Sequence, residues 1–189
     1  MYALDGRTKY VKPDKVAANE AVGWYTEEGL AYYNVQKSYN EFKAVGDYNS
    51  LIDLVRDNME LLEDTKYEQN LYAIRTEAIT LWRQAVGTPV GVISYNVKKN
   101  DDGVPVAGIA FRNISDKKIV EFTIKFNSYD KNGKIVDPHY NVFIANEIEL
   151  DVAAAEFYYW DFDKAMNVYS INDIRVTEVI FSDGSKWKR

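Results

Sequence analysis

The chain has no cysteine and a single histidine among its 189 residues. The absence of cysteine excludes disulfides, thiolate metal sites and cysteine nucleophiles, although it does not identify the compartment. One histidine, His139, cannot form the usual zinc site, and acid–base catalysis would require a positioned partner beside it. His139 follows Pro138 in an expected loop, so we favour a surface position without a catalytic role.

Other features are also missing. No glycine-rich loop of the type that cradles phosphate is present, no apolar run could span a bilayer, and no basic-then-apolar leader precedes Tyr2. Residues 1–87 carry 10 basic and 14 acidic residues, and residues 88–189 carry 13 and 15. Because neither half has a basic stripe, we expect no nucleic-acid binding through phosphate neutralisation.

What the chain does contain is a change of pattern after Gly87. No glycine or proline lies between Gly46 and Gly87, and apolar residues recur there every three or four positions. Beyond Gly87 the apolar residues alternate with polar ones, and turn pairs such as Asn132-Gly133 separate them. The sequence therefore predicts an α+β fold with a helical part, residues 1–87, and an antiparallel β-sandwich, residues 88–189.

The first 27 residues predict a small ββα unit. A strand precedes an Asp5-Gly6 turn, and residues 9–11 form the expected return strand. Asp14 is suited to begin a short helix, and Gly23 to end it. A unit of this size needs a neighbour to complete its core.

Three longer helices are predicted next. The first carries an apolar stripe and ends at Gly46, the second begins at the N-cap Asp47, and the third begins with the capping-box pattern Thr65–Glu68. The stripe of the first helix consists of Tyr32, Val35, Tyr39 and Phe42. We favour an ordinary bundle. The alternative is a tetratricopeptide-like hairpin with a peptide groove, but no second copy follows at that period.

Residues 119–129 give the clearest strand pattern, because apolar and polar residues alternate along the whole segment. Further strands are expected at residues 90–98, 104–113, 141–150, 155–161 and 173–182. Six or seven short strands in about 100 residues favour an immunoglobulin-like sandwich of two sheets. The basic tail, residues 186–189, is interpreted as a solvated strand end.

The aromatic run Phe157–Trp160 is the main candidate for binding. In a strand, Phe157 and Tyr159 point to one face, while Tyr158 and Trp160 point to the other. One pair can fill the sandwich core, and we favour the interpretation that the run also packs against the helical part. The alternative is that the second pair is exposed. We take Tyr158, Trp160 and the neighbouring Asp161 as the candidate surface for a sugar or a protein partner.

A second candidate is the loop Ser128–Gly133, which has a few features of a calcium loop. Aligning Gly133 with the glycine of such a loop puts His139 where a bidentate glutamate belongs. A turn between strands explains Asp130, Asn132 and Gly133 without an ion. We therefore expect neither a metal nor a cofactor.

Two segments resemble known families. Met1–Thr8, with its Asp-Gly-Arg, and Val22–Glu27, with its Gly-Trp-Tyr, resemble a short module that recurs in surface proteins of Gram-positive anaerobes. Phe126–Asp130, preceded by Gly108–Asn113, resembles the signature of the FxLYD-type sandwich domain found in Gram-positive lipoproteins. In that signature a leucine takes the place of Ser128.

The resemblance implies an uncharacterised domain of bacterial surface proteins, with an extracellular or cell-surface location. Together with the missing catalytic motifs, it suggests a non-enzymatic binding or scaffold module that contacts a protein or spaces other domains. The alternative is a carbohydrate-binding module that uses residues 157–160 against a cell-wall glycan. A hydrolase is a distant third hypothesis, because no sequence spacing reveals a glycosidase pair of carboxylates.

Overall fold

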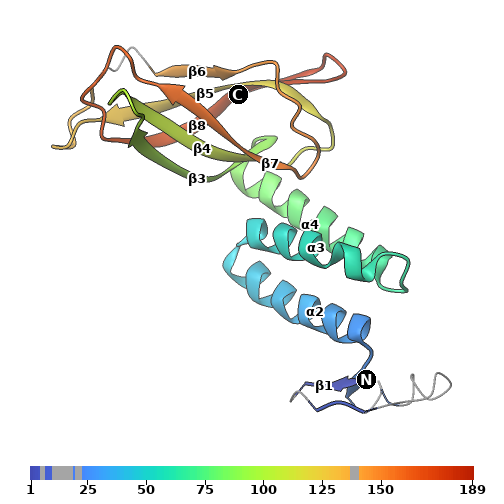
Figure 1. The fold of residues 1–189 in the computed structure, drawn as a ribbon. Helices are drawn as coiled ribbons and strands as arrows, with labels where there is room; N and C mark the ends of the chain where they lie inside the picture. Colours follow the sequence, from blue (N-terminus) through green and yellow to red (C-terminus); the bar gives the residue numbers. More distant parts are fainter. Residues whose placement is uncertain (5–6, 10–18, 20–22, 137–140) are drawn as a thin grey trace. The chain divides into compact units, whose positions relative to one another are not determined.

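The structure is a computed structural model that describes residues 1–4, 7–9, 19, 23–136 and 141–189. It confirms the predicted α+β class, with helices followed by antiparallel sheets (Figure 1). The contacts divide the chain into two compact units, Met1–Leu81 and Trp82–Arg189, which we call the helical unit and the sandwich unit. The boundary falls inside a helix, a few residues before the predicted change at Gly87.

From the first long helix onward, the elements follow one another in the order that the sequence predicts, whereas the strand at Trp24–Tyr25 was not predicted. The helical unit begins with β1 (Tyr2–Ala3) and β2 (Trp24–Tyr25), and its helices are α2 (Glu27–Val45), α3 (Tyr48–Leu62) and α4 (Glu68–Val86), the last of which continues into the sandwich unit. The strands of the sandwich unit are β3 (Val90–Lys99), β4 (Pro105–Asn113), β5 (Ile119–Tyr129), β6 (Val142–Ala145), β7 (Ala155–Asp161), β8 (Ser170–Phe181) and β9 (Lys186–Lys188).

The described residues on both sides of the predicted N-terminal turn pair as a hairpin. Tyr2 bridges Thr8, the Ala3 N–H donates to the Arg7 carbonyl at 2.9 Å, and the Lys9 N–H donates to the Met1 carbonyl at 3.0 Å. β1 also pairs with β2, a partner that was not predicted. The predicted Asp5-Gly6 turn and the helix expected from Asp14 lie outside the described residues.

The end of α2 and the start of α3 lie where the sequence predicts them, and capping hydrogen bonds explain both positions. Gly46 adopts a left-handed conformation, φ 73°, and the Asp47 N–H donates to the Phe42 carbonyl, which closes α2 in a Schellman arrangement. The Asp47 carboxylate then accepts from the Ser50 N–H at 3.1 Å and caps α3. Four completely buried apolar side chains form a core cluster of the helical unit: Val35, Val55, Leu62 and Leu71.

The predicted capping box of the third helix is wrong in detail. The Thr65 hydroxyl accepts from the Tyr67 N–H at 3.2 Å, and the Glu68 carboxylate accepts from the Asp64 N–H at 3.3 Å. The helix begins at Glu68, because residues 63–67 form a turn in which Asp64 has φ 58°. The same side chains thus satisfy backbone donors one residue earlier than the capping box predicts.

The sandwich unit contains two antiparallel sheets, with strand orders β3-β4-β7 and β6-β5-β8-β9 (Figure 1). One hydrophobic cluster draws buried side chains from both sheets, including Phe111 of β4, Phe122 of β5 and Val179 of β8. The alternation predicted for β5 is confirmed, since Phe122, Ile124 and Phe126 are completely or almost completely buried.

One predicted strand is much shorter than expected. Residues 141–150 were predicted to be extended throughout, but β6 covers only Val142–Ala145. Glu147 interrupts the strand with φ 55°, a conformation that an extended ladder does not accept. The chain then returns to β5 through the Ile148 N–H, which donates to the Val120 carbonyl at 3.2 Å.

Candidate functional site

Strand β7 separates its aromatic residues between two faces, as alternation predicts. Tyr158 and Trp160 lie on the inner face, where both rings pack against Phe111. The Trp160 indole N–H donates to the Ile144 carbonyl at 3.2 Å, and burial raises the pKa of the Tyr158 hydroxyl. These two side chains of the predicted binding surface are therefore half-buried parts of the sandwich.

The outer face of β7 carries the other pair. Phe157 is 50% exposed and Tyr159 is 67% exposed, and their rings lie 6.2 Å apart with only 17° between their planes. Asp161, the third predicted residue, is exposed at the end of the same strand. Asp161 therefore lies on the same face as the two exposed rings. Tyr158 and Trp160, which were predicted to form a binding surface with Asp161, lie on the opposite face.

A glycine makes room for this outer pair. Gly108 of β4 lies opposite Tyr159, and a Cβ atom placed on Gly108 would come within 3.0 Å of the Tyr159 ring. Ala110 lies opposite Phe157. With such small residues beneath them, the two rings lie close to the sheet, and we call Phe157 and Tyr159 with Gly108 and Ala110 the aromatic platform.

A second candidate site lies in the helical unit, between α2 and α4. It is an open groove of about 640 Å³ that combines half-buried tyrosine rings with exposed carboxamides. The residues that characterise it are Tyr32, Tyr33, Tyr39, Gln36, Asn40 and Asn70. We call it the tyrosine groove.

One end of the tyrosine groove is fixed by a charged network. The Tyr39 hydroxyl donates to Glu77 Oε2 at 2.6 Å, and Lys43 Nζ donates to the Tyr39 hydroxyl at 2.8 Å and to Glu77 Oε1 at 2.6 Å. The hydrogen bonds from Lys43 and then Tyr39 lower the pKa of the Glu77 carboxyl. The ring of Tyr32 is held by stacking on Tyr67, with the ring centroids 4.5 Å apart. The walls of the groove are therefore ordered by contacts within the unit.

In the loop that was considered for calcium, the polar side chains form hydrogen bonds within the loop itself or are buried. The Asp130 carboxylate accepts from the N–H groups of Asn132 and Lys134 at 2.8 and 3.0 Å, and these bonds lower its pKa. Ser128, the first residue of the proposed calcium loop, is buried. Among the described residues there is no cluster of three or more acidic or histidine side chains suited to a metal. His139 lies outside the described residues.

The acidic groups also bear on the hydrolase hypothesis. The carboxyl groups of Glu77, Asp130 and Asp183 each have a pKa that is shifted downward by hydrogen bonds. A general acid in a glycosidase needs a raised pKa. These three groups therefore do not have the electrostatics of such an acid.

No family model matches the chain, and no curated protein matches it. A solved structure of a hypothetical protein from Peptoclostridium difficile 630 is similar over 54% of this chain and 87% of its own, with 14% sequence identity and a TM-score of 0.42. No described helix has the length and apolar character needed to cross a membrane.

The sequence suggested a peptide groove only for a tetratricopeptide-like hairpin, and it did not predict which aromatic pair of β7 is exposed. Tyr32 and Tyr39 were assigned to an apolar stripe, although in the structure they are half-buried and line the groove. The available signal was the residue type, because a stripe that uses tyrosine where leucine would suffice retains hydroxyl groups that need water or a partner.

Proposed function

We propose that this protein is a binding module that contacts another protein, and that the tyrosine groove receives a segment of the partner's polypeptide chain. The observation that carries the proposal is the composition of the groove. Tyrosine supplies large contact area at a small entropic cost and is enriched at the energetic centres of interfaces. The exposed carboxamides of Gln36, Asn40 and Asn70 can both donate to and accept from a peptide backbone.

The size and order of the groove agree with this role. Its volume of about 640 Å³ lies within the usual range for ligand sites. The network of Tyr39, Lys43 and Glu77 holds one wall in place before any partner arrives, which lowers the entropic cost of binding. We place this activity at the bacterial cell surface, on the resemblance of the N-terminal and FxLYD-like segments.

The test is selection of a random peptide library on the purified full chain, followed by calorimetry on the enriched peptides. Asn40→Ala and Asn70→Ala should each weaken binding by about tenfold, the cost of losing well-placed hydrogen bonds at an interface. Asn34→Ala is the matched control, because Asn34 is exposed on α2 like Asn40 but does not line the groove. Equal affinities for all three variants, or no enriched peptide, would refute the proposal.

A second candidate function is carbohydrate binding, and the aromatic platform favours it. Two exposed, nearly parallel rings present a flat apolar surface on which the C–H faces of sugar rings can pack, and Asn96 and Asp161 nearby offer hydrogen-bonding groups. In this version of the hypothesis the ligand contacts Phe157 and Tyr159, and Tyr158 and Trp160 support the strand from inside.

A glycan array distinguishes this function from the first. Binding should disappear in Tyr159→Ala and persist in Tyr169→Ala, because Tyr169 is equally exposed, at 69%, but lies outside the platform. Binding that survives Tyr159→Ala would remove the platform as a sugar site. The groove variants should leave glycan binding unchanged.

A further inference from the structure

The sandwich unit contains a pocket that neither of these functions uses. It has a volume of about 530 Å³ and is formed by the last turn of α4, residues 87–89, the turn at residues 115–117 and the hairpin between β8 and β9. Thr88 and Ser115 are buried in its lining, and Pro89, Phe181 and Trp187 supply its apolar walls. We call it the cationic pocket.

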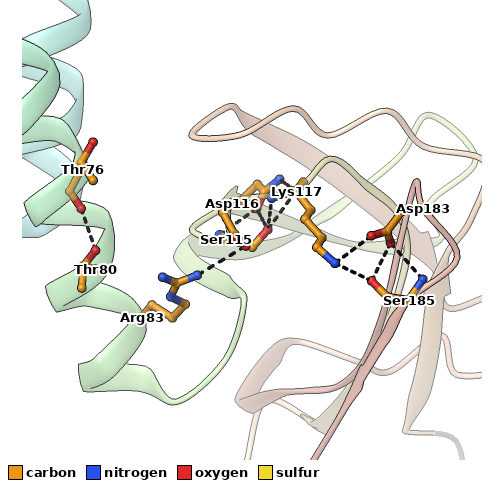
Figure 2. Close-up of polar contacts among 9 residues, drawn as sticks. Thr76, Thr80, Arg83, Ser115, Asp116, Lys117, Asp183 and Ser185 are labelled. Carbon is orange, nitrogen blue, oxygen red and sulfur yellow. Dashed lines mark hydrogen bonds and ion pairs between the residues drawn. The ribbon is translucent and has the colours of Figure 1, made fainter.

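The pocket has a rigid wall. Asp183 accepts from the Ser185 N–H at 2.9 Å and from Lys117 Nζ at 2.7 Å, and Lys117 Nζ also donates to the Ser185 hydroxyl at 3.0 Å (Figure 2). The hydrogen bond from Lys117, followed by those from Ser185, holds the pKa of the Asp183 carboxyl well below its usual range. The hairpin between β8 and β9 is thereby fixed to the turn that carries Lys117.

The charge of the pocket is opposite to that of the whole chain. Its lining contains three cations, Arg83, Lys117 and Lys186, and one acid, Asp116, whereas the chain carries a net charge of −6. Lys117 is already paired with Asp183. The other two cations have weaker ion pairs or none. Arg83 lies 3.8 Å from Asp116, beyond hydrogen-bond distance (Figure 2). In the described part of the chain, Lys186 has no ion pair.

We propose that the cationic pocket binds a carboxylate that carries an apolar or aromatic group. The guanidinium of Arg83 and the ammonium of Lys186 pair with the carboxylate, and the apolar group packs against the apolar lining that Trp187 and Pro89 supply. The geometry favours a carboxylate over a neutral ligand because the two cations are the loosely paired groups of the lining. A free organic acid and the C-terminus of a peptide share this chemistry.

The experiment is an NMR titration of the ¹⁵N-labelled full chain, followed at the indole N–H of Trp187, which is assigned by its loss in Trp187→Phe. The probes are phenylacetate, the tripeptide N-acetyl-Gly-Gly-Phe and the C-terminal amide of that tripeptide. Saturable shifts with phenylacetate identify a free acid as sufficient, and shifts with the tripeptide acid alone identify a peptide C-terminus. The amide should bind at least about tenfold more weakly than the acid, because it lacks the charge.

The variants Arg83→Gln and Lys186→Gln should each raise the dissociation constant of the bound acid by about tenfold. Lys188→Gln is the matched control, because Lys188 lies on the same strand, pairs with Glu178 and does not line the pocket. It should leave the affinity unchanged. Thermal unfolding verifies that each variant folds.

Three results would overturn the proposal. The first is the absence of saturable shifts with either acid up to about 10 mM, where even weak binding is measurable. The second is equal affinity for the acid and the amide. The third is an equal loss in Lys188→Gln and in the two pocket variants, which would indicate general attraction to surface charge. The peptide selection on the tyrosine groove can succeed or fail independently of all three.

Discussion

At the scale of single residues, two glycines lie in strands that aromatic rings cover closely. A Cβ atom on Gly91 of β3 would come within 2.5 Å of the Trp82 ring, and one on Gly108 of β4 within 3.0 Å of the Tyr159 ring. Glycine weakens a strand, so its presence in two strand interiors indicates close approach by another group. The two covering rings differ, since Trp82 is 9% exposed and Tyr159 is 67% exposed.

We predict that Gly91→Ala destabilises the protein by about 1–3 kcal/mol, the usual cost of inserting a methyl group into a packed site. Gly108→Ala should cost less than about 1 kcal/mol, because the exposed Tyr159 ring can move away. Urea denaturation of both variants measures the difference. Equal losses would mean that burial of the covering ring does not decide the cost.

Asp183 makes stability depend on pH. Its pKa in the folded protein lies below the unfolded value of 3.8, so its contribution is present above pH 3.8 and is lost as the pH falls through the folded pKa. Wild type should therefore lose more thermal stability than Asp183→Asn between about pH 5 and about pH 2. Asp101→Asn removes the same charge from the turn at residues 100–103 and should behave like wild type. A parallel loss in wild type and Asp183→Asn would contradict the assignment.

Alternation along β7 correctly predicted which aromatic residues share a face, but not which face is buried. Both pairs are aromatic, so the sequence contains no polar face to mark the solvent side. The orientation follows from pairing with β4, where Ile109 and Phe111 are completely buried and Gly108 and Ala110 lie on the other face. That information comes from a strand more than 40 residues away.

At the scale of elements, boundaries are reliable where one side chain or one glycine decides them. Asp47 and Gly46 define the turn between α2 and α3 as predicted, because capping depends on groups within four residues. β6 could not be bounded in this way. The end of β6 depends on the positive φ of Glu147, and a glutamate in the sequence does not predict a left-handed conformation.

The cap of α3 provides a test at this scale. Asp47→Ala removes the acceptor of the Ser50 N–H and should destabilise the helical unit by about 1 kcal/mol. Asp47→Asn keeps an acceptor oxygen and should cost no more than about a few tenths of a kcal/mol. Chemical denaturation followed by circular dichroism measures both. An equal loss in the two variants would assign the effect to charge and not to the cap.

At the scale of the whole molecule, one helix belongs to two units. Residues Glu68–Leu81 of α4 lie in the helical unit, and Trp82–Val86 lie in the sandwich unit. The sequence indicated the change of secondary structure at Gly87 but not this division, because the helical pattern runs unbroken through Trp82. Contacts such as that of Trp82 with Gly91 place the last turn of the helix with the strands.

The division predicts that two buried residues of the same helix stabilise different parts of the protein. Trp82→Ala should lower the local stability of the sandwich unit by about 3 kcal/mol, since it uncovers Gly91, whereas Leu71→Ala should lower that of the helical unit by a similar amount. Native-state hydrogen exchange separates the two effects, because amides report the stability of their own cooperative unit. Amides of β3 and β4 should exchange faster in Trp82→Ala, and amides of α2 and α3 faster in Leu71→Ala. If either variant accelerated exchange equally in all of these elements, the chain would unfold as one cooperative body and the boundary inside α4 would have no energetic meaning.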